Sequence, residues 1–304
     1  MPPLAAPGVS LVSTTAGLLQ HYWSTQQWRL LYRETDANLL PASLAPFQVI
    51  ASPSNAMWAD PFPVSLGARR FVLFEECTYR FWGRTTGSRG ILRVMEYFGD
   101  GKWSPPRTIL ERPYHLSYPF VFESGGRHYL IPETLANSSI ELYEAVEFPW
   151  RWRFVRSLLT DVSAVDSTLV EIDGTWWMFT CMESFGAPNR DLCLFHTDDP
   201  VNGRWMPHQK NPVVVDAGCA RMAGNLWFDG THWIRPGQDC SAGYGGAVKL
   251  RRILDLTPHS YCEQALGRLG PETIEGASGV HTLNMAAGLQ FSDARRSVER
   301  WRLC

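Results

Sequence analysis

WADPFPVSLGARRFVLFEE, residues 58–76, combines a short hydrophobic run, a turn with a glycine, and a second run of aromatic and β-branched residues. This pattern is typical of a β-hairpin. The unit recurs as LSYPFVFESGGRHYLIPET at 116–134, VDSTLVEIDGTWWMFTCMES at 165–184, RMAGNLWFDGTHWIRPGQDC at 221–240 and, more weakly, GVHTLNMAAGLQFSDARR at 279–296. We therefore expect a repeat protein built from hairpins.

Further strand pairs are expected between the copies. After the first copy, residues 91–98 and 102–110 flank a Gly-Asp-Gly turn, and similar segments follow the next three copies. Each block thus offers four short strands in roughly 50–60 residues, the period of a four-stranded propeller blade. The sequence predicts an all-β, five-bladed β-propeller in a single domain, residues 25–304. Residues 1–24, rich in Pro, Ala, Ser and Thr, are expected to form a loose N-terminal arm.

The aromatic content fits this architecture. The 304 residues include 13 Trp, 15 Phe and 10 Tyr, and 45% of them are hydrophobic, which excludes a disordered chain. Neighbouring blades of a propeller pack face to face, and large aromatic side chains fill the wedge between them. We therefore expect most tryptophans to be structural.

Several function classes are excluded or disfavoured. A net charge of −2 without a long basic block argues against nucleic-acid binding. No apolar run approaches the ~18 residues of a membrane span, and the first residues lack the features of a signal peptide, so we expect a cytoplasmic protein. The seven cysteines form no CxxC pair, which disfavours zinc-ribbon and redox motifs and favours buried, reduced thiols. Motifs of nucleotide cradles, HExxH metalloproteases and GxSxG hydrolases are absent.

The repeat indicates where a site could lie. Alignment on the turn glycines makes Asp60, Tyr118, Asp166, Met222 and His281 equivalent, at spacings of 58, 48, 56 and 59 residues. The innermost strands of a propeller line a central channel, so equivalent residues from different blades converge on one rim. Asp60 and Asp166 are therefore expected to face the same axis.

Acidic residues also end the second strand of most copies. They are Glu75, Glu76, Glu133, Glu183 and Asp239. Carboxyl groups around one pocket raise one another's pKa, so that a protonated acid can stand beside an ionised base. Two such carboxyls are the equipment for hydrolysis of a glycosidic bond. Each residue also has a structural reading, as a turn cap or a solvated charge.

Other polar and aromatic residues are candidates for substrate contact. Arg221 could bind an anionic group or neutralise the carboxylates. His281 could be an axial ligand or a proton carrier, although a single histidine is more often structural. The remaining candidates are His115 and Tyr118 for a sugar hydroxyl, and Trp58 and Trp82 for stacking on a sugar ring.

Several stretches resemble one protein family. They are WADPFP, HLSYPFVFESGGRHYLIPET, DSTLVEIDGTWWMF, RMAGNLWFDG, QDCSAGYGGAV and GVHTLN. Together they resemble the five-bladed propeller domain at the N-terminus of plant glucosamine inositolphosphorylceramide transferases and its bacterial relatives, over about residues 25–296. The resemblance implies that transferase chemistry belongs to a separate C-terminal domain, so it does not supply a reaction for this chain.

The fold implied is similar to glycoside hydrolase family 43 and the invertase–levansucrase group. Those enzymes use an Asp base or nucleophile on the first blade, an Asp on a later blade, and a Glu acid, which implies such roles for Asp60 in WADP and Asp166 in VDST. Where the acid is expected, this chain reads CARMAGNLW without a Glu. Glu133 or Asp239 would have to take its place. Family 43 relatives often hold an axial cation near a fifth-blade histidine, which makes His281 the one candidate for a cation; otherwise no metal or cofactor is expected.

The sequence thus favours a carbohydrate-active enzyme that hydrolyses or transfers a glycosidic bond. Asp60 would be base or nucleophile, Glu133 the acid, and Asp166 a residue that holds substrate and tunes a neighbouring pKa. Arg221 would bind an anionic substituent. The substrate-binding set comprises Arg221, Tyr118, His115, Glu75, Asp239, His281 and Trp58. A non-catalytic glycan or sugar-nucleotide module that assists a partner glycosyltransferase, and a different reaction in the same pocket, remain open alternatives.

Overall fold

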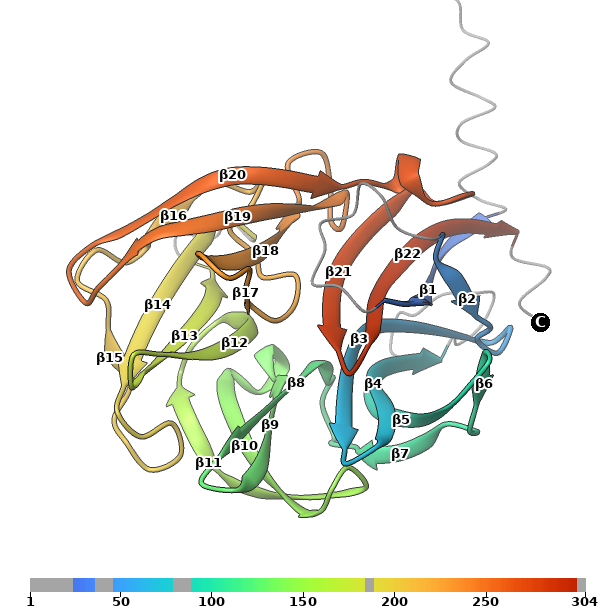
Figure 1. Cartoon of the computed structure of the whole chain (residues 1–304), viewed down its shortest axis with the longest axis horizontal. Helices are drawn as coiled ribbons and strands as arrows, with labels where there is room; N and C mark the ends of the chain where they lie inside the picture. Colours follow the sequence, from blue (N-terminus) through green and yellow to red (C-terminus); the bar gives the residue numbers. More distant parts are fainter. Residues whose placement is uncertain (1–23, 36–45, 79–88, 184–188, 300–304) are drawn as a thin grey trace, which may run out of the picture.

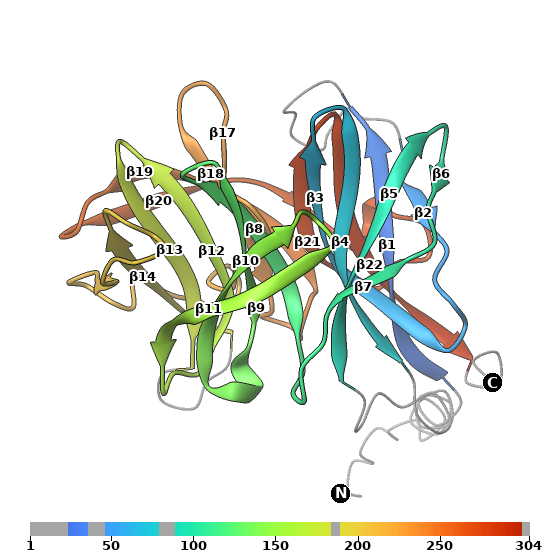
Figure 2. The same ribbon diagram turned by 90° about the horizontal axis from the view of Figure 1, so that it is seen from below.

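The computed structural model describes residues 24–35, 46–78, 89–183 and 189–299. Five antiparallel sheets stand around a common axis like the blades of a fan (Figure 1). Three sheets have four strands, and the other two add a short fifth strand at the outer edge. The predicted all-β, five-bladed propeller with four-stranded blades is therefore confirmed. The side view shows many of the strands running steeply from one face of the disc to the other (Figure 2).

The blades follow one another along the chain. Blade 1 contains β3 (Ala56–Leu66), β4 (Arg69–Thr78), β5 (Gly90–Gly99), β6 (Lys102–Trp103) and β7 (Arg107–Leu110). Blade 2 contains β8 (Ser117–Ser124), β9 (Arg127–Glu133), β10 (Ser139–Glu147) and β11 (Arg151–Thr160), with the 3-10 helix Leu135–Asn137 between β9 and β10. Blade 3 contains β12 (Ala164–Ile172), β13 (Thr175–Met182), β14 (Asp191–Thr197), β15 (Met206–Pro207) and β16 (Val214–Val215).

Blades 4 and 5 complete the ring. Blade 4 contains β17 (Trp227–Phe228), β18 (Trp233–Asp239), β19 (Ala247–Leu256) and β20 (Tyr261–Leu269), followed by the 3-10 helix Pro271–Thr273. Blade 5 contains β21 (Gly279–Ala286), β22 (Leu289–Glu299), β1 (Ser24–Glu34) and β2 (Gln48–Ile50), in the order β2-β1-β22-β21.

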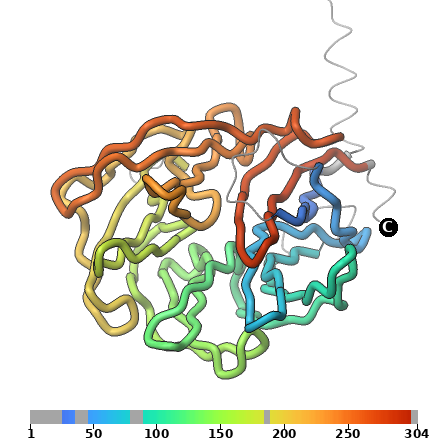
Figure 3. The backbone as a smooth tube through the Cα atoms, viewed as in Figure 1, coloured from blue at the N-terminus to red at the C-terminus, as the bar shows by residue number. Residues whose placement is uncertain are grey.

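Blade 5 joins the two ends of the chain. Strand β1 pairs with β22 along its whole length, from Ser24 opposite Glu299 to Glu34 opposite Leu289. In the tube view the blue and red ends of the chain lie side by side (Figure 3). The repeat in the sequence did not predict this pairing, since the paired residues lie more than 250 positions apart. The predicted N-terminal arm falls outside the described residues except for Ser24, which is the first residue of β1.

Aromatic side chains fill the gaps between blades, as expected. Each pair of neighbouring blades from 1 to 4, and the pair 5 and 1, has such a contact. The ring centroids are 5.4 Å apart for Phe71 and Trp150, 5.3 Å for Phe122 and Trp176, 6.2 Å for Phe179 and Tyr261, and 5.8 Å for Trp103 and Phe291. Trp82 lies outside the described residues.

A β-bulge interrupts four of the five innermost strands at the equivalent point. At each bulge two residues of the inner strand stand opposite one residue of its partner, and the first of the two is Asp60, Tyr118, Asp166 or His281. Asp60, Tyr118 and Asp166 have positive φ angles of 53°, 44° and 53°. This left-handed conformation is uncommon outside glycine and costs about 1–3 kcal/mol per residue, so neighbouring contacts must hold it in place. Bulges re-aim side chains, and here they direct the repeated position toward the axis.

Hydrogen bonds around the axis hold these bulges. The carboxylate of Asp293 in blade 5 accepts the Asp60 N–H at 2.9 Å, and the Asp60 carboxylate accepts the Tyr118 N–H in blade 2 at 3.1 Å. The Tyr118 hydroxyl lies 2.8 Å from the Thr168 hydroxyl in blade 3 and accepts the Gly224 N–H of blade 4 at 2.8 Å.

Asn284 of blade 5 completes this ring of bonds. Its carbonyl oxygen accepts the Asn225 N–H of blade 4 at 2.7 Å, and its amide donates to the Pro61 carbonyl of blade 1 at 2.8 Å. The innermost strands of all five blades are therefore cross-linked near one rim.

Four of the six cysteines in the described part of the chain are buried: Cys77, Cys181, Cys193 and Cys219. Among the described residues, no helix is long and apolar enough to cross a membrane.

Candidate functional site

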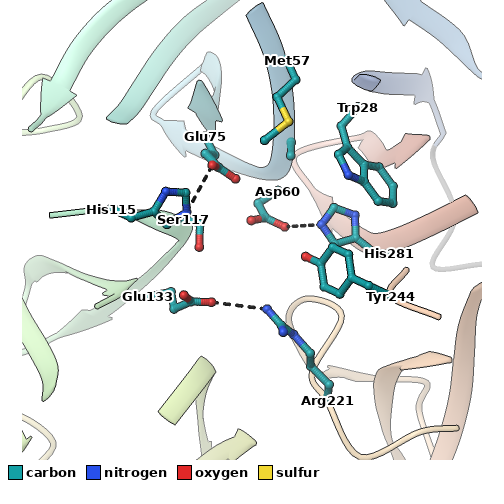
Figure 4. Close-up of a pocket in the computed structure, with 11 residues that line it drawn as sticks. Trp28, Met57, Asp60, Glu75, His115, Ser117, Glu133, Arg221, Tyr244 and His281 are labelled. Atoms are coloured by element: carbon teal, nitrogen blue, oxygen red, sulfur yellow. Dashed lines mark hydrogen bonds and ion pairs between the residues drawn. The ribbon is translucent and has the colours of Figure 1, made fainter. Parts of the chain in front are cut away.

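One pocket of about 200 Å³ opens where the bulged ends of the inner strands converge. Its wall is contributed by blades 1, 2, 4 and 5 and mixes carboxyl, cationic and aromatic side chains (Figure 4). The lining residues are Trp28, Met57, Ala59, Asp60, Glu75, His115, Ser117, Glu133, Arg221, Tyr244 and His281.

An aspartate–histidine–aspartate chain forms one side of the pocket. Nδ1 of His281 lies 2.7 Å from Oδ1 of Asp293, and its Nε2 lies 3.2 Å from Oδ1 of Asp60. All three residues are at least nine-tenths buried. Asp293 also accepts the backbone N–H groups of His281 and Thr282, so it is fully engaged. The contacts from Asp293 through His281 fix the Asp60 carboxylate at the edge of the pocket.

His281 and Asp60 are both ionised at neutral pH. Burial opposes the charge of His281, but Asp293 and Asp60 outweigh it and raise the pKa of His281 to about 10. Burial likewise opposes the charge of Asp60, but the His281 cation and the Tyr118 N–H outweigh it and lower the pKa of Asp60. The pocket therefore contains an imidazolium between two carboxylates.

Arg221 forms the opposite side. Its Nε donates to Oδ2 of Asp166 at 2.6 Å and its Nη1 to Asn189 at 2.7 Å. Its Nη2 reaches Oε2 of Glu133 at 3.3 Å. Asp166 is 2% exposed and lies behind Arg221 rather than in the pocket wall. Arg221 thus holds the Glu133 carboxyl group at the pocket wall, and Asp166 in turn fixes the position of Arg221.

The two acidic partners of Arg221 differ from Asp60. Burial and the neighbouring Asp166 raise the pKa of Glu133 to about 8, although Arg221 opposes the shift. Burial also raises the pKa of Asp166, against the effect of Arg221. Glu133 is therefore mostly protonated at neutral pH, whereas Asp60 is ionised. The two environments shift the pKa values of these carboxyl groups in opposite directions, as in acid–base pairs of enzymes.

Aromatic rings cover the remaining wall. The rings of Trp28 and His281 have centroids 4.0 Å apart, and Tyr244 stands edge-on to His281 at 5.3 Å and over Arg221 at 4.9 Å. Gly245 makes this approach possible. Its φ is +65°, and a Cβ there would lie 2.7 Å from Cη2 of Trp28.

Six of the predicted site residues meet in this pocket. They are Asp60, Glu75, His115, Glu133, Arg221 and His281. Asp166 joins them indirectly, through Arg221. The repeat thus brought together residues that are up to 221 positions apart, since Asp60 and His281 are in contact.

Three predicted contact residues lie elsewhere. Tyr118 is fully buried and points into the interior, because its hydroxyl bridges blades 3 and 4. Trp58 is buried within blade 1 and donates its Nε1–H to Glu76 at 2.8 Å. Asp239 pairs with Lys249 at 3.0 Å outside the pocket. These three side chains therefore lie outside the pocket wall.

Two other acidic candidates are also outside the pocket. Glu76 faces away from Glu75, because successive side chains of a strand point to opposite faces. Glu183 is exposed and accepts a hydrogen bond from Ser163.

Five lining residues were not predicted as site residues: Trp28, Met57, Ala59, Ser117 and Tyr244. Trp28 comes from β1, whose place in blade 5 the repeat did not predict. Tyr244 belongs to residues 241–246, which follow the fourth copy of the repeated hairpin and were not part of the pattern. Met57 and Ser117 each stand close before the repeated bulge position, and this adjacency to Asp60 and Tyr118 was a signal that could have found them.

The residues around His281 do not fit a cation in this arrangement. Asp60, His281 and Asp293 have potential ligand atoms within 4.8 Å of one another. However, both ring nitrogens of His281 bond directly to carboxylates, and its raised pKa keeps both protonated. A protonated imidazole has no lone pair for a metal.

Solved structures with the same architecture act on sugars. A family 117 glycoside hydrolase from the marine bacterium Zobellia galactanivorans aligns with a TM-score of 0.56 at 9% identity, over 88% of this chain and 91% of that chain. An inulosucrase from Halalkalicoccus jeotgali, bound to kestose, aligns with a TM-score of 0.55 at 14% identity, over 80% and 82% of the two chains. At such identities the similarity concerns the fold alone.

A plant protein has a higher sequence identity to this chain than these solved structures have. The glucosamine inositolphosphorylceramide transferase 1 of Oryza sativa subsp. japonica is 36% identical over 216 residues, which are 69% of this chain and 28% of the relative. The chain therefore matches under a third of that protein's length. The family model described as "Glucosamine inositolphosphorylceramide transferase 1, N-terminal" matches residues 43–276. This chain, with its five blades and axial pocket, belongs to that family.

Proposed function

We propose that the axial pocket is the active site of a carbohydrate-active enzyme that breaks a glycosidic bond and passes the sugar to water or to an acceptor hydroxyl. The observation that carries the proposal is the pair of carboxyls with opposite pKa shifts, Asp60 lowered and Glu133 raised to about 8, in one pocket. Such a pair supplies a base and an acid at neutral pH. The sugar-acting neighbours of the same fold and the transferase name of the relative support the substrate class.

Each residue then has a defined task. Glu133 gives its proton to the glycosidic oxygen as the bond from that oxygen to the anomeric carbon breaks. Asp60 takes the proton of the water or acceptor hydroxyl whose oxygen forms the new bond to that carbon. One proton enters and one leaves the site, and Glu133 regains its proton from solvent. Both oxygens of Asp60 already accept one bond, from His281 and from Tyr118, and each keeps a second lone pair.

Arg221 and Asp166 support the acid in this proposal. Asp166 raises the pKa of Glu133, and Arg221 holds its carboxyl group at the pocket wall. Arg221 also has the donor capacity to contact a polar substituent of the substrate. We propose no cofactor: the reaction is a proton-assisted group transfer, and the imidazolium of His281 supplies the positive charge on the axis. A partner transferase and a cytoplasmic location stay predictions.

A second function has its own supporting observation. Asp60 is paired with His281, and Asp166 and Glu133 both contact Arg221, so the acidic groups are already neutralised. This pairing is compatible with a non-catalytic module that binds a glycan or sugar nucleotide for a partner glycosyltransferase.

One experiment separates the two functions. Sugar nucleotides and oligosaccharides are screened for thermal stabilisation, because a ligand of the folded state raises the melting temperature. Ligands that stabilise are then incubated with the protein, and products are followed by mass spectrometry. The enzyme proposal expects turnover that falls at least about 10²-fold in Asp60→Asn and in Glu133→Gln. Stabilisation without turnover supports the binding module, and full turnover by Asp60→Asn would refute the mechanism.

A further inference from the structure

Glu75 is a buried carboxyl group without a hydrogen-bond partner for one of its oxygens. It lies in the second half of β4 of blade 1 and points into the pocket (Figure 4), yet its side chain is only 6% exposed. Its Oε1 makes no hydrogen bond to any described residue. Leaving a buried acceptor unpaired is unfavourable. The proposed acid–base pair does not use Glu75. Another role would therefore have to offset the free-energy cost of burying its unpaired oxygen.

His115 is positioned beside this oxygen. Nε2 of His115 lies 3.4 Å from Oε1 of Glu75, which is too long for a full hydrogen bond. Nδ1 accepts the Gly90 N–H at 2.9 Å, so the proton of the neutral ring is on Nε2. Burial lowers the pKa of His115, which keeps the ring neutral. His115 therefore offers a donor on the same side of the pocket as Glu75.

Gly90 allows the two groups to come together. A Cβ at this position would lie 2.7 Å from Oε1 of Glu75 and 2.8 Å from Cε1 of His115. Such a Cβ would also lie 2.2 Å from the Leu116 carbonyl oxygen, so any other residue would displace this backbone or one of the two side chains. The pair is thus held by its own packing at the edge of the pocket.

The charge state of the pocket indicates the ligand chemistry. Burial, together with Asp60 and Glu133, raises the pKa of Glu75 well above its usual value. A protonated carboxyl group both donates and accepts a hydrogen bond, and so does a hydroxyl group. The cationic groups nearby, Arg221 and His281, are already balanced by Asp166, Asp60 and Asp293. An uncharged polyol fits this environment better than an ion.

We propose that Glu75 and His115 form a specificity subsite that binds two adjacent hydroxyl groups of the sugar in the axial pocket. Glu75 would exchange hydrogen bonds with one hydroxyl, and the Nε2–H of His115 would donate to the other. This inference rests on the proposed function for the identity of the ligand as a sugar. It assigns a binding role and no chemical step to Glu75.

The test uses methyl glycosides of glucose, galactose, mannose and arabinose, with their monodeoxy analogues, titrated by calorimetry into the full chain. For the methyl glycoside that binds most tightly, Glu75→Ala and His115→Asn are expected to weaken binding at least tenfold. The deoxy analogue that lacks the contacted hydroxyl should lose nothing further in Glu75→Ala. Glu76→Gln is the matched control, because Glu76 is the neighbour on the opposite face of β4 and bonds to Trp58.

The outcomes are separable. Equal affinity of Glu75→Ala and wild type, an equal loss for every deoxy analogue, or no binding of any methyl glycoside to wild type would overturn the subsite. Tighter, Glu75-dependent binding of the 2-amino analogues would reassign it to an ammonium group and overturn the hydroxyl assignment. If Glu75→Ala unfolds, His115→Asn alone decides the matter. Glu75-dependent binding without turnover would leave the subsite standing while the enzyme proposal fails, and turnover with an unchanged KM in Glu75→Ala would do the reverse.

Discussion

Glu133 keeps its proton at neutral pH at a cost to the stability of the fold. Its pKa is about 8 in the folded protein, against about 4.3 for a free glutamate. A raised folded-state pKa means that the folded state is favoured fully only below pH 4.3 and loses stability as pH rises toward 8. The residue thus carries a penalty at pH 7 that a permanently neutral side chain would not carry.

We therefore predict that Glu133→Gln is more stable than wild type at pH 7.5, by about 1–3 kcal/mol, while it loses turnover. The gain should shrink at pH 5, because pH 5 lies much closer to the pKa of the unfolded glutamate and the free-energy cost of keeping Glu133 protonated is smaller there. Urea unfolding at the two pH values measures the difference. Glu147→Gln, an exposed glutamate of the same blade, should change little at either pH. A destabilised Glu133→Gln protein at pH 7.5 would mean that the bond to Arg221 outweighs the burial of the charge.

The bulges of the inner strands hold strained residues in place through contacts between blades. The bulges at Asp60, Tyr118 and Asp166 hold non-glycine residues at positive φ, and the strained positions are bound to one another across blades. Tyr118 is the clearest case, because its buried hydroxyl joins β8 to Thr168 of β12 and to the backbone of Gly224. Its role is to fix strands rather than to contact a ligand.

Removal of that hydroxyl should therefore destabilise the protein. Tyr118→Phe leaves the Gly224 N–H buried without its acceptor, which costs about 1–3 kcal/mol. Urea unfolding followed by circular dichroism measures the loss. Tyr129→Phe is the control, since Tyr129 is also buried but its hydroxyl makes no hydrogen bond to the described residues. Equal effects of the two substitutions would show that the hydroxyl bridge contributes nothing.

Local, repeating sequence patterns determine which features of this structure could be predicted from the sequence. Hairpins, blades and the convergence of Asp60 with His281 follow from local patterns that repeat, so they are readable without a structure. The repeat cannot distinguish a residue at the bulge that faces the pocket, such as Asp60, from one that faces the interior, such as Tyr118. Tyr244 stands on a loop outside the repeat, and Trp28 reaches the pocket through pairing between the two ends of the chain. Such long-range pairing leaves no periodic signal.

Two kinds of contact hold the ring together: hydrogen bonds between the innermost strands, and the pairing and packing of β1 in blade 5. Near one rim, side-chain hydrogen bonds link the innermost strands from blade to blade. In blade 5, β1 is inserted between β22 and β2 and packs on both neighbouring blades. Leu30 and Tyr32 join the hydrophobic cluster shared with blade 1, whereas Leu31 joins the cluster shared with blade 4. Loss of β1 would therefore open the ring at two interfaces at once.

This arrangement predicts that the five blades unfold as one unit. Leu31 is fully buried, so Leu31→Ala should cost about 2–5 kcal/mol. Because blade 3 cannot keep its neighbours once the ring opens, amide protection in residues 164–182 should fall by the same free energy as in residues 24–34. Hydrogen exchange followed by mass spectrometry, under conditions where exchange reports opening equilibria, measures both peptides. Leu254→Ala, at an exposed site of blade 4, should leave both unchanged. A loss of protection confined to residues 24–34 and 289–299 would instead show that blade 5 opens alone and that the ring is not a single cooperative structure.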